Sequence, residues 1–348
     1  MNMETDKAVL TGNGDDERFE QAVRLLLGGE LVAFPTETVY GLGALATSEE
    51  AVRKIYRAKG RPSDNPLIAH VGTAEEVGRY AADVPATARK LMDAFWPGPL
   101  TLILKAAPGV FAPSVTAGLD TVGIRMPDHP AALGLLRRIG QPLAAPSANT
   151  SGKPSPTAAD HVLADMHGKI PYILDGGRTG IGIESTVLDL TADVPTILRP
   201  GAVTAAMLEP VIGPVNGSAE AAEAGAGAPR APGMKYTHYS PDAPVFLIAP
   251  DLAAIRSAVG QLHADGRRVA LVAPEGFGEA GADWFFRAGR PGDPESVSAD
   301  LYDALRACDG TDADLILAAA TDETGIGRAV MNRLGKAAGG RWFGERNE

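Results

Sequence analysis

A tract of small residues divides this chain of 348 residues into two parts. Between Gly217 and Pro232 the sequence reads GSAEAAEAGAGAPRAP, in which Ala, Gly, Pro and Glu dominate. A segment of this kind has no side chains with which to bury a core, so it predicts a linker. The parts before and after it are each long enough for a domain. We therefore expect a first domain over residues 1–212, a linker over 213–243 and a second domain over 244–348.

Many short apolar strands and few helices follow one another in the first part. Helices are expected near residues 86–95, 130–139 and 157–166. The apolar runs that predict strands are ELVAFP, PLIAHV, LTLIL, TVGIRMP, PLAAPS, YILDGG, STVLDL and TILRPG. This excess of strands predicts an α/β fold with a large mixed sheet that curls on itself, rather than a doubly wound parallel sheet. After the linker, VFLIAP, RVALVAP and DLILAAA alternate with helical sequence, which predicts a small Rossmann-like α/β domain with a parallel sheet.

Composition excludes several classes of protein. The net charge is -11, so neither a basic nucleic-acid-binding face nor tight RNA binding is expected. Nothing approaches the ~18 consecutive apolar residues of a membrane span, and the N-terminus lacks the apolar core of a signal peptide, so we expect a cytoplasmic protein. Cys308 is the only cysteine, which excludes intrachain disulfides and cysteine-clustered zinc sites. Gly325 and Gly327 resemble a phosphate loop, but too little chain follows for a dinucleotide fold, so packing at a helix start is predicted instead.

One loop in the first part carries two cations on a stiff backbone. It reads RAKGRPSDNPL, and Lys59 and Arg61 stand two positions apart before Pro62 and Pro66. The prolines prevent the preceding helix from continuing and restrict the backbone. A restricted backbone lowers the entropy cost of holding two positive charges together, as the binding of an anion requires. The loop therefore predicts an anion site, with an ordinary solvated loop as the alternative.

Further motifs lie around this loop in a fixed order: FPTETVYGLG, WPGPLTLIL, TAGLDTVGIRMPDHP, APSANTSGKPSPT, GIESTVLDL and LRPG. From about residue 15 onward the chain resembles the YrdC-like threonylcarbamoyl-AMP synthase family in its long, two-domain form. The resemblance implies a twisted mixed sheet with a concave ligand surface. It also implies synthesis of threonylcarbamoyl-AMP from L-threonine, bicarbonate or CO2, and ATP, with release of pyrophosphate. The product would serve threonylcarbamoyladenosine modification of tRNA next to the anticodon.

The resemblance also assigns residues to ATP and to threonine. The Lys and Arg residues among them suit the phosphates of ATP and the carboxylate of threonine. Lys59 and Arg61 are assigned to catalysis. The residues assigned to ATP are Lys59, Arg61, Asn65, Thr116, Ser147, Asn149, Arg199 and Tyr236. Those assigned to threonine are Thr38, His70, Arg125, Ala145 and Ser185. No reactive cysteine or Ser-His-Asp arrangement is visible, so catalysis is expected to rest on positioning and charge neutralisation, with Mg2+ carried by the ATP phosphates and no protein metal site.

Several of these residues have a structural interpretation as well. Ser147 and Asn149 can form a turn satisfied by its own hydrogen bonds. His70 follows an apolar strand, where a lone histidine is often a satisfied core residue. Thr38 favours a strand by propensity alone. The role of Glu37 stays undecided.

The stretch PGMKYTHYSP interrupts the small-residue tract and suggests a lid. We expect it to fold back over the catalytic cavity and exclude water, with Tyr236 at the nucleotide. The alternative is that Tyr236 and Tyr239 anchor the linker to the second domain.

Two other functions remain open. A carbamoyltransferase of the hydrogenase-maturation type would share the core fold but bring zinc-finger cysteines. An RNA-binding module is disfavoured by the negative charge. Under the main hypothesis the partners are ATP, L-threonine, bicarbonate and the downstream tRNA threonylcarbamoyl-transfer machinery. Contact with tRNA itself would be weak or indirect, and no membrane partner is expected.

Overall fold

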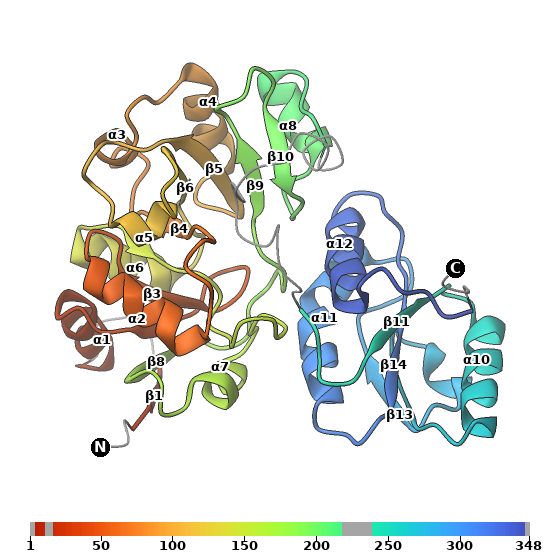
Figure 1. The fold of residues 1–348 in the computed structure, drawn as a ribbon. Coiled ribbons are helices and arrows are strands. Elements are labelled where there is room, and N and C mark those ends of the chain that lie inside the picture. Colours follow the sequence, from red (N-terminus) through yellow and green to blue (C-terminus); the bar gives the residue numbers. More distant parts are fainter. Residues whose placement is uncertain (1–3, 11–16, 218–238, 345–348) are drawn as a thin grey trace. The chain divides into compact units, whose positions relative to one another are not determined.

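The computed structural model describes residues 4–10, 17–217 and 239–344 (Figure 1). Most of the predicted linker, residues 218–238, lies outside these ranges, and so does Tyr236. The lid and the nucleotide contact predicted for Tyr236 therefore stay predictions. Among the helices within the described ranges, none combines the length and the apolar character that crossing a membrane requires.

The chain divides into two compact units on either side of the linker. The first unit holds nearly all of the chain before the small-residue tract. Two short segments of that part, Gly152–Ser155 and Ile181–Ile183, belong to the second unit together with the C-terminal region. The domain boundaries at residues 212 and 243 stay predictions.

A ten-stranded mixed sheet forms the centre of the first unit (Figure 1). Its strands are β1 (Asp6–Val9), β2 (Val32–Phe34), β3 (Gly41–Leu45), β4 (Ile68–His70), β5 (Leu100–Lys105), β6 (Thr121–Arg125), β7 (Leu143–Ala144), β8 (Tyr172–Asp175), β9 (Thr186–Asp189) and β10 (Thr196–Arg199). Their order in the sheet is β1-β8-β2-β3-β7-β4-β6-β5-β9-β10. Parallel neighbours such as β4 and β6 stand beside antiparallel ones such as β3 and β7, which confirms the predicted mixed sheet.

Most inner strands are buried on both faces, which is why they appear in the sequence as apolar runs and not as alternating patterns. The helices of the first unit are α1 (Glu17–Leu27), α2 (Glu49–Lys59), α3 (Val77–Tyr80), α4 (Ala86–Phe95), α5 (Pro113–Thr116), α6 (Pro130–Ile139), α7 (Ala159–Met166) and α8 (Ala205–Ile212). Phe19 and Leu26 of α1 pack with Leu135 of α6 against the sheet in one apolar cluster. Val52 and Ile55 of α2 belong to a second, larger cluster.

Helix α2 matters for function because it delivers Lys59 at its end. It starts at the N-cap Ser48, whose side chain accepts a hydrogen bond from the Ala51 amide. It ends at Gly60, which has a φ of 61° and accommodates the left-handed turn into the cationic loop. The positions of the cap and the stop therefore fix where the Lys59 side chain leaves the helix.

Gly43, in strand β3, is required by packing. A Cβ on Gly43 would lie 2.6 Å from a ring carbon of Phe34, on the neighbouring strand. Gly43 therefore lets β2 and β3 pair around a buried aromatic ring.

The second unit is a small parallel α/β domain, as predicted. Its strands are β11 (Val245–Ile248), β12 (Val269–Ala273), β13 (Trp284–Arg287) and β14 (Leu315–Ala319), paired in parallel in the order β11-β14-β12-β13. Its helices are α10 (Leu252–Ala264), α11 (Pro294–Cys308), α12 (Gly327–Ala338) and the 3-10 turn η1 (Phe277–Ala280). At Gly327 a Cβ would collide with the Asp322 carbonyl oxygen, so the Gly-x-Gly pattern reflects a tight helix start.

Tyr239 is packed into this second unit. It is buried, its ring stacks on that of Tyr302 with the centroids 5.4 Å apart, and the guanidinium of Arg333 lies 5.5 Å from its ring centroid. For Tyr239 the structure supports the anchoring interpretation and not the lid.

Candidate active site

The turn between β2 and β3 gathers hydroxyl groups in a buried place. The Oγ1 atoms of Thr36 and Thr38 lie 2.8 Å apart, and the Thr36 hydroxyl donates to the Val39 carbonyl at 2.7 Å. Thr36 also accepts from the amides of Thr38 and Val39. Thr36 thus fixes the turn, and the Thr38 side chain within it is fully buried.

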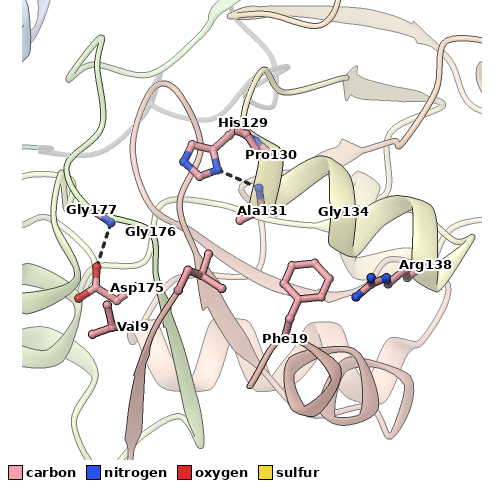
Figure 2. Close-up of a pocket in the computed structure, with 11 residues that line it drawn as sticks. Val9, Phe19, His129, Pro130, Ala131, Gly134, Arg138, Asp175, Gly176 and Gly177 are labelled. Atoms are coloured by element: carbon pink, nitrogen blue, oxygen red, sulfur yellow. Dashed lines mark hydrogen bonds between the residues drawn. The ribbon is translucent and has the colours of Figure 1, made fainter. Parts of the chain in front are cut away.

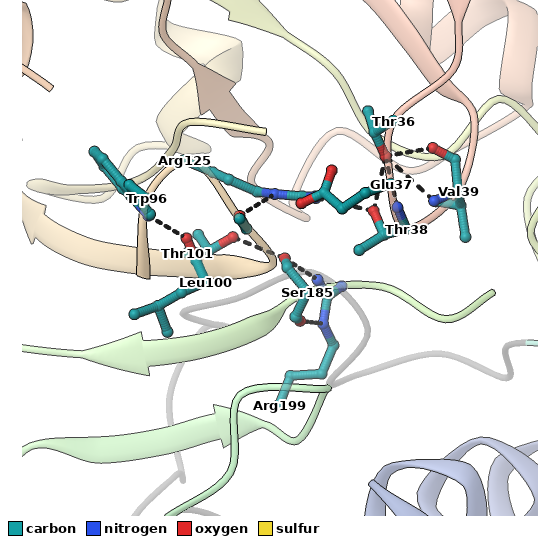
Figure 3. Close-up of polar contacts among 11 residues, drawn as sticks. Thr36, Glu37, Thr38, Val39, Trp96, Leu100, Thr101, Arg125, Ser185 and Arg199 are labelled. Atoms are coloured by element: carbon teal, nitrogen blue, oxygen red, sulfur yellow. Dashed lines mark hydrogen bonds and ion pairs between the residues drawn. The ribbon is translucent and has the colours of Figure 1, made fainter. Parts of the chain in front are cut away.

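Arg125, at the end of β6, reaches this turn (Figure 3). Its Nε donates to the Gly98 carbonyl at 3.2 Å, and NH1 donates to Thr38 Oγ1 at 3.1 Å. NH2 lies 2.5 Å from Glu37 Oε1, and the Arg125 side chain is only 5% exposed. A buried guanidinium with one face directed at a carboxylate is suited to binding a carboxylate ligand.

A second set of hydroxyls comes from β5 and the start of β9. Ser185 Oγ lies 2.8 Å from Thr101 Oγ1 and accepts from Arg199 NH2 at 3.2 Å. Arg199 Nε also donates to the Ser185 carbonyl at 3.1 Å. Arg199 was assigned to ATP, and the structure brings it to Ser185, which was assigned to threonine. Figure 3 shows this group and the Arg125 group in the same region of the unit.

His70, at the end of β4, stands opposite Arg125 on β6 and Leu143 on β7 in the register of the sheet. It is 3% exposed, and its Nδ1 has no hydrogen-bond partner. Burial, assisted by the positive charge of Arg125, lowers the pKa of His70 to about 3, so the imidazole is neutral at physiological pH. Within the described part of the chain, Nδ1 thus keeps hydrogen-bonding capacity that a ligand could use, and the contact of His70 with threonine stays a prediction.

Lys59 is buried and already has partners. It is 2% exposed, and its Nζ donates to the carbonyls of Ser147 at 2.6 Å and Asn149 at 2.5 Å. A longer contact of 3.4 Å joins Nζ to Asn149 Oδ1. The Asn149 amide in turn donates to the Thr150 carbonyl at 2.8 Å. The Lys59 ammonium therefore ties the Ser-x-Asn turn to the end of α2, which joins two of the predicted nucleotide motifs.

Arg61 sits in the loop beyond α2 and folds onto that loop. Its NH2 donates to the carbonyls of Asn65 at 3.3 Å and Pro66 at 3.2 Å. The Tyr56 hydroxyl donates to the Asn65 carbonyl at 3.0 Å and to the Ser114 carbonyl at 2.8 Å. This hydroxyl brings the loop close to α5, on which the predicted residue Thr116 lies. The side-chain oxygen of Asn65 is buried without a hydrogen-bond partner.

The Ser-x-Asn turn is attached to the rest of the site through the backbone. Ser147 forms a bridge with Gly41, directly after the Thr38 turn, and the Ala148 amide donates to the Tyr40 carbonyl at 2.8 Å. Ala145 donates its amide to the Ile68 carbonyl at 3.1 Å, two residues before His70. The two groups of predicted residues thus meet around the central strands β3, β7, β4 and β6.

Sequence reasoning missed two partners in the site. Thr101 lies in an apolar run, where nothing in the sequence marks its hydroxyl as part of a site. Gly98 contributes through its backbone carbonyl, which accepts from Arg125, and a backbone contact leaves no trace in the sequence. Glu37 was left undecided, and the structure places it against Arg125.

A separate cavity of about 600 Å³ lies elsewhere in the first unit (Figure 2). Phe19, His129, Arg138 and Asp175 contribute to its lining, and none of the predicted site residues does. His129 accepts a hydrogen bond from the Ala131 amide and so caps α6. Burial lowers the pKa of His129. This arrangement gives His129 a structural role.

Within the described part of the chain, no group of three or more His, Cys, Asp or Glu side chains could hold a metal ion. Mg2+ bound to ATP stays a prediction.

Comparison with known proteins agrees with the motifs and the fold. The Sua5/YciO/YrdC family model, described as "Telomere recombination", matches residues 24–201, and the model described as "Threonylcarbamoyl-AMP synthase, C-terminal domain" matches residues 203–339. A threonylcarbamoyl-AMP synthase of Bacillus subtilis is 51% identical over 331 residues, which cover 94% of each chain. One of Pyrococcus abyssi is 46% identical over 334 residues, covering 93% of this chain and 96% of the relative.

Solved structures give the same result. The crystal structure of Pyrococcus abyssi Sua5 complexed with L-threonine matches with a TM-score of 0.89 and 43% identity, covering 97% of this chain and 98% of the other. Both the resemblance seen in the motifs and the predicted fold class are confirmed. The chain belongs to the threonylcarbamoyl-AMP synthase family.

Proposed function

We propose that this protein synthesises threonylcarbamoyl-AMP from L-threonine, bicarbonate or CO2, and ATP, and releases pyrophosphate. The observation that carries the proposal is the buried group around Arg125. Its guanidinium contacts the Thr38 hydroxyl, the neutral imidazole of His70 stands opposite Arg125 in the sheet register, and Ser185 lies in the same region of the unit. Such a group offers a cation for an α-carboxylate and neutral hydrogen-bonding groups for a small hydroxylated side chain. A relative that is 43% identical is described as complexed with L-threonine, which supports the same ligand here.

The reaction needs no covalent enzyme intermediate. The free amine of threonine attacks bicarbonate, a C–N bond forms, and water leaves, which gives a carbamate. A carbamate oxygen then attacks the α-phosphorus of ATP, the bond to the β-phosphate oxygen breaks, and pyrophosphate leaves. The enzyme would supply positioning and neutralisation of negative charge. Cys308, the lone thiol, is buried, and burial raises the pKa of this thiol to about 12, so it is no candidate nucleophile.

Lys59 and Arg61 would contribute differently to the nucleotide site. The Lys59 ammonium holds the Ser147–Asn149 turn, so it would shape the surface on which the nucleotide lies. Arg61 NH2 donates to two loop carbonyls by long contacts of 3.3 and 3.2 Å. Its guanidinium could exchange these two contacts for phosphate oxygens, since charged acceptors form the stronger hydrogen bonds.

The remaining expectations belong to this proposal. They are Mg2+ with the ATP, a cytoplasmic location, and delivery of the product to a tRNA-modifying partner with weak or indirect tRNA contact. The two alternative functions have less support. The whole-length relatives are named synthases, and one cysteine cannot supply a zinc finger.

The test is release of pyrophosphate from ATP in the presence of bicarbonate. Turnover should depend on threonine, with serine much poorer and no amino acid giving background only. Turnover independent of threonine would refute the proposal. A chain that ends at Pro214, assayed beside the full chain, tests whether the linker contributes as a lid.

A further inference from the structure

Glu37 makes an ion pair with Arg125 that is poorly built for stability. Its Oε1 lies 2.5 Å from Arg125 NH2, yet neither oxygen of the carboxylate has a hydrogen-bond partner of acceptable geometry. The side chains of Glu37 and Arg125 are 13% and 5% exposed. Removing two charges from water is costly, and the cost is recovered only when the remaining hydrogen-bonding capacity is filled.

Another partly buried carboxylate of the same unit shows how a structural glutamate is held. Glu49 accepts from the Ser114 amide at 3.1 Å, from the Ser114 hydroxyl at 2.6 Å and from Arg53 Nε at 2.7 Å. The hydrogen bonds of Ser114 contribute to lowering the pKa of Glu49, as expected for a satisfied carboxylate. Apart from the ion pair with Arg125, no hydrogen bond reaches either Glu37 oxygen from the described residues, so the carboxylate keeps capacity for a further donor.

An amino acid supplies that donor. An α-amino acid carries an ammonium with three N–H donors next to its carboxylate, so its two charges match a carboxylate and a guanidinium that lie side by side. If the ligand carboxylate takes the guanidinium face of Arg125 that now points at Glu37, the ligand ammonium reaches the Glu37 oxygens. The site then holds two positive and two negative charges, in place of the one positive and one negative charge of Arg125 and Glu37. Its net charge is therefore unchanged.

We propose that Glu37 binds the α-ammonium of the amino-acid substrate, and that the Glu37–Arg125 pair is the recognition element for a zwitterion. This inference rests on the proposed function. Glu37 would then determine specificity. A carboxylic acid without the ammonium would pair with Arg125 and leave the buried Glu37 carboxylate without a positive partner, which is unfavourable.

The test compares two ligands on two forms of the full chain. The ligands are L-threonine and the analogue in which a hydroxyl replaces its ammonium, and binding is measured by calorimetry. In Glu37→Gln, threonine should bind about 10- to 100-fold more weakly, because a charge-assisted contact becomes a neutral one, while the analogue should change by less than about 2-fold or bind more tightly. Glu20→Gln serves as the matched control, since Glu20 pairs with Arg138 on the surface.

The other outcomes overturn the proposal in distinguishable ways. Equal loss for both ligands would mean that Glu37 only holds Arg125 in place, and no loss for either would make Glu37 a bystander. If the wild-type chain bound no threonine at all, the proposed function itself would be wrong. Should Glu37→Gln fail to fold, Glu37→Asp keeps the charge but shortens its reach, and it should weaken threonine more than the analogue.

Discussion

Replacing Lys59 by methionine should destabilise the first unit as well as impair the reaction. The substitution keeps most of the side-chain volume and removes the ammonium that donates to the carbonyls of Ser147 and Asn149 at 2.6 and 2.5 Å. Lys59 is 2% exposed, so water cannot readily replace it. With about 1 to 3 kcal/mol for each buried acceptor left unsatisfied, we expect a loss of about 2 to 5 kcal/mol in the free energy of unfolding.

Arg61→Met is the matched comparison. Arg61 NH2 donates to two loop carbonyls at the long distances of 3.3 and 3.2 Å, and Arg61 is partly exposed, so its replacement should lower the free energy of unfolding by about 1 kcal/mol or less. Turnover should fall in both variants, whereas stability should fall only in Lys59→Met. The two roles are therefore separable by experiment.

Urea unfolding of the first unit measures the difference. Trp96 belongs to the first unit, while Trp284 and Trp342 belong to the second. In a background where the latter two are replaced by phenylalanine, tryptophan fluorescence reports the first unit alone. If Lys59→Met unfolded within about 0.5 kcal/mol of its parent at an unchanged denaturant slope, the argument that the ammonium holds the turn would be refuted.

Three further predictions follow from the site and the sheet. Because folding lowers the pKa of His70 from 6.5 to about 3, the unfolded chain binds the proton more readily, so stability should fall as the pH drops from 6.5 toward 3, by about 2 kcal/mol at pH 5. A His70→Gln variant should lack this part of the pH dependence in acid unfolding curves, and identical curves would contradict the assignment. Gly43→Ala should cost about 1 to 3 kcal/mol through its clash with a buried ring, whereas Gly78→Ala, with open space around its Cβ, should be neutral in thermal unfolding. Ser185→Ala removes the hydroxyl that links Arg199 to its neighbour strand, so it should abolish most of the thermal protection given by threonine, and full protection would remove Ser185 from the site.

Local sequence determined the elements that carry most of this fold. The run LTLIL and the segment after PDHP became β5 and α6 because apolar spacing, prolines and glycines act over a few residues. The surplus of strands likewise determined a mixed sheet, and the alternation after the linker determined a parallel one. Short elements such as α3 and α5, of four residues each, gave no comparable signal.

The sequence also predicted which residues belong to the site, because Lys59, Arg125 and Ser185 stand in motifs that mark the family. What each side chain touches was decided only by the tertiary structure. Arg125 meets Glu37 across 88 positions of chain, and Lys59 meets Asn149 across 90, as consequences of strand order and register. Hydrogen bonds and burial depend on three-dimensional neighbours, and no local pattern encodes them. For that reason the sequence alone predicted that Lys59 and Arg125 bind the anionic groups of substrates. Only the fold revealed that Lys59 holds a turn and that Arg125 already pairs with a carboxylate.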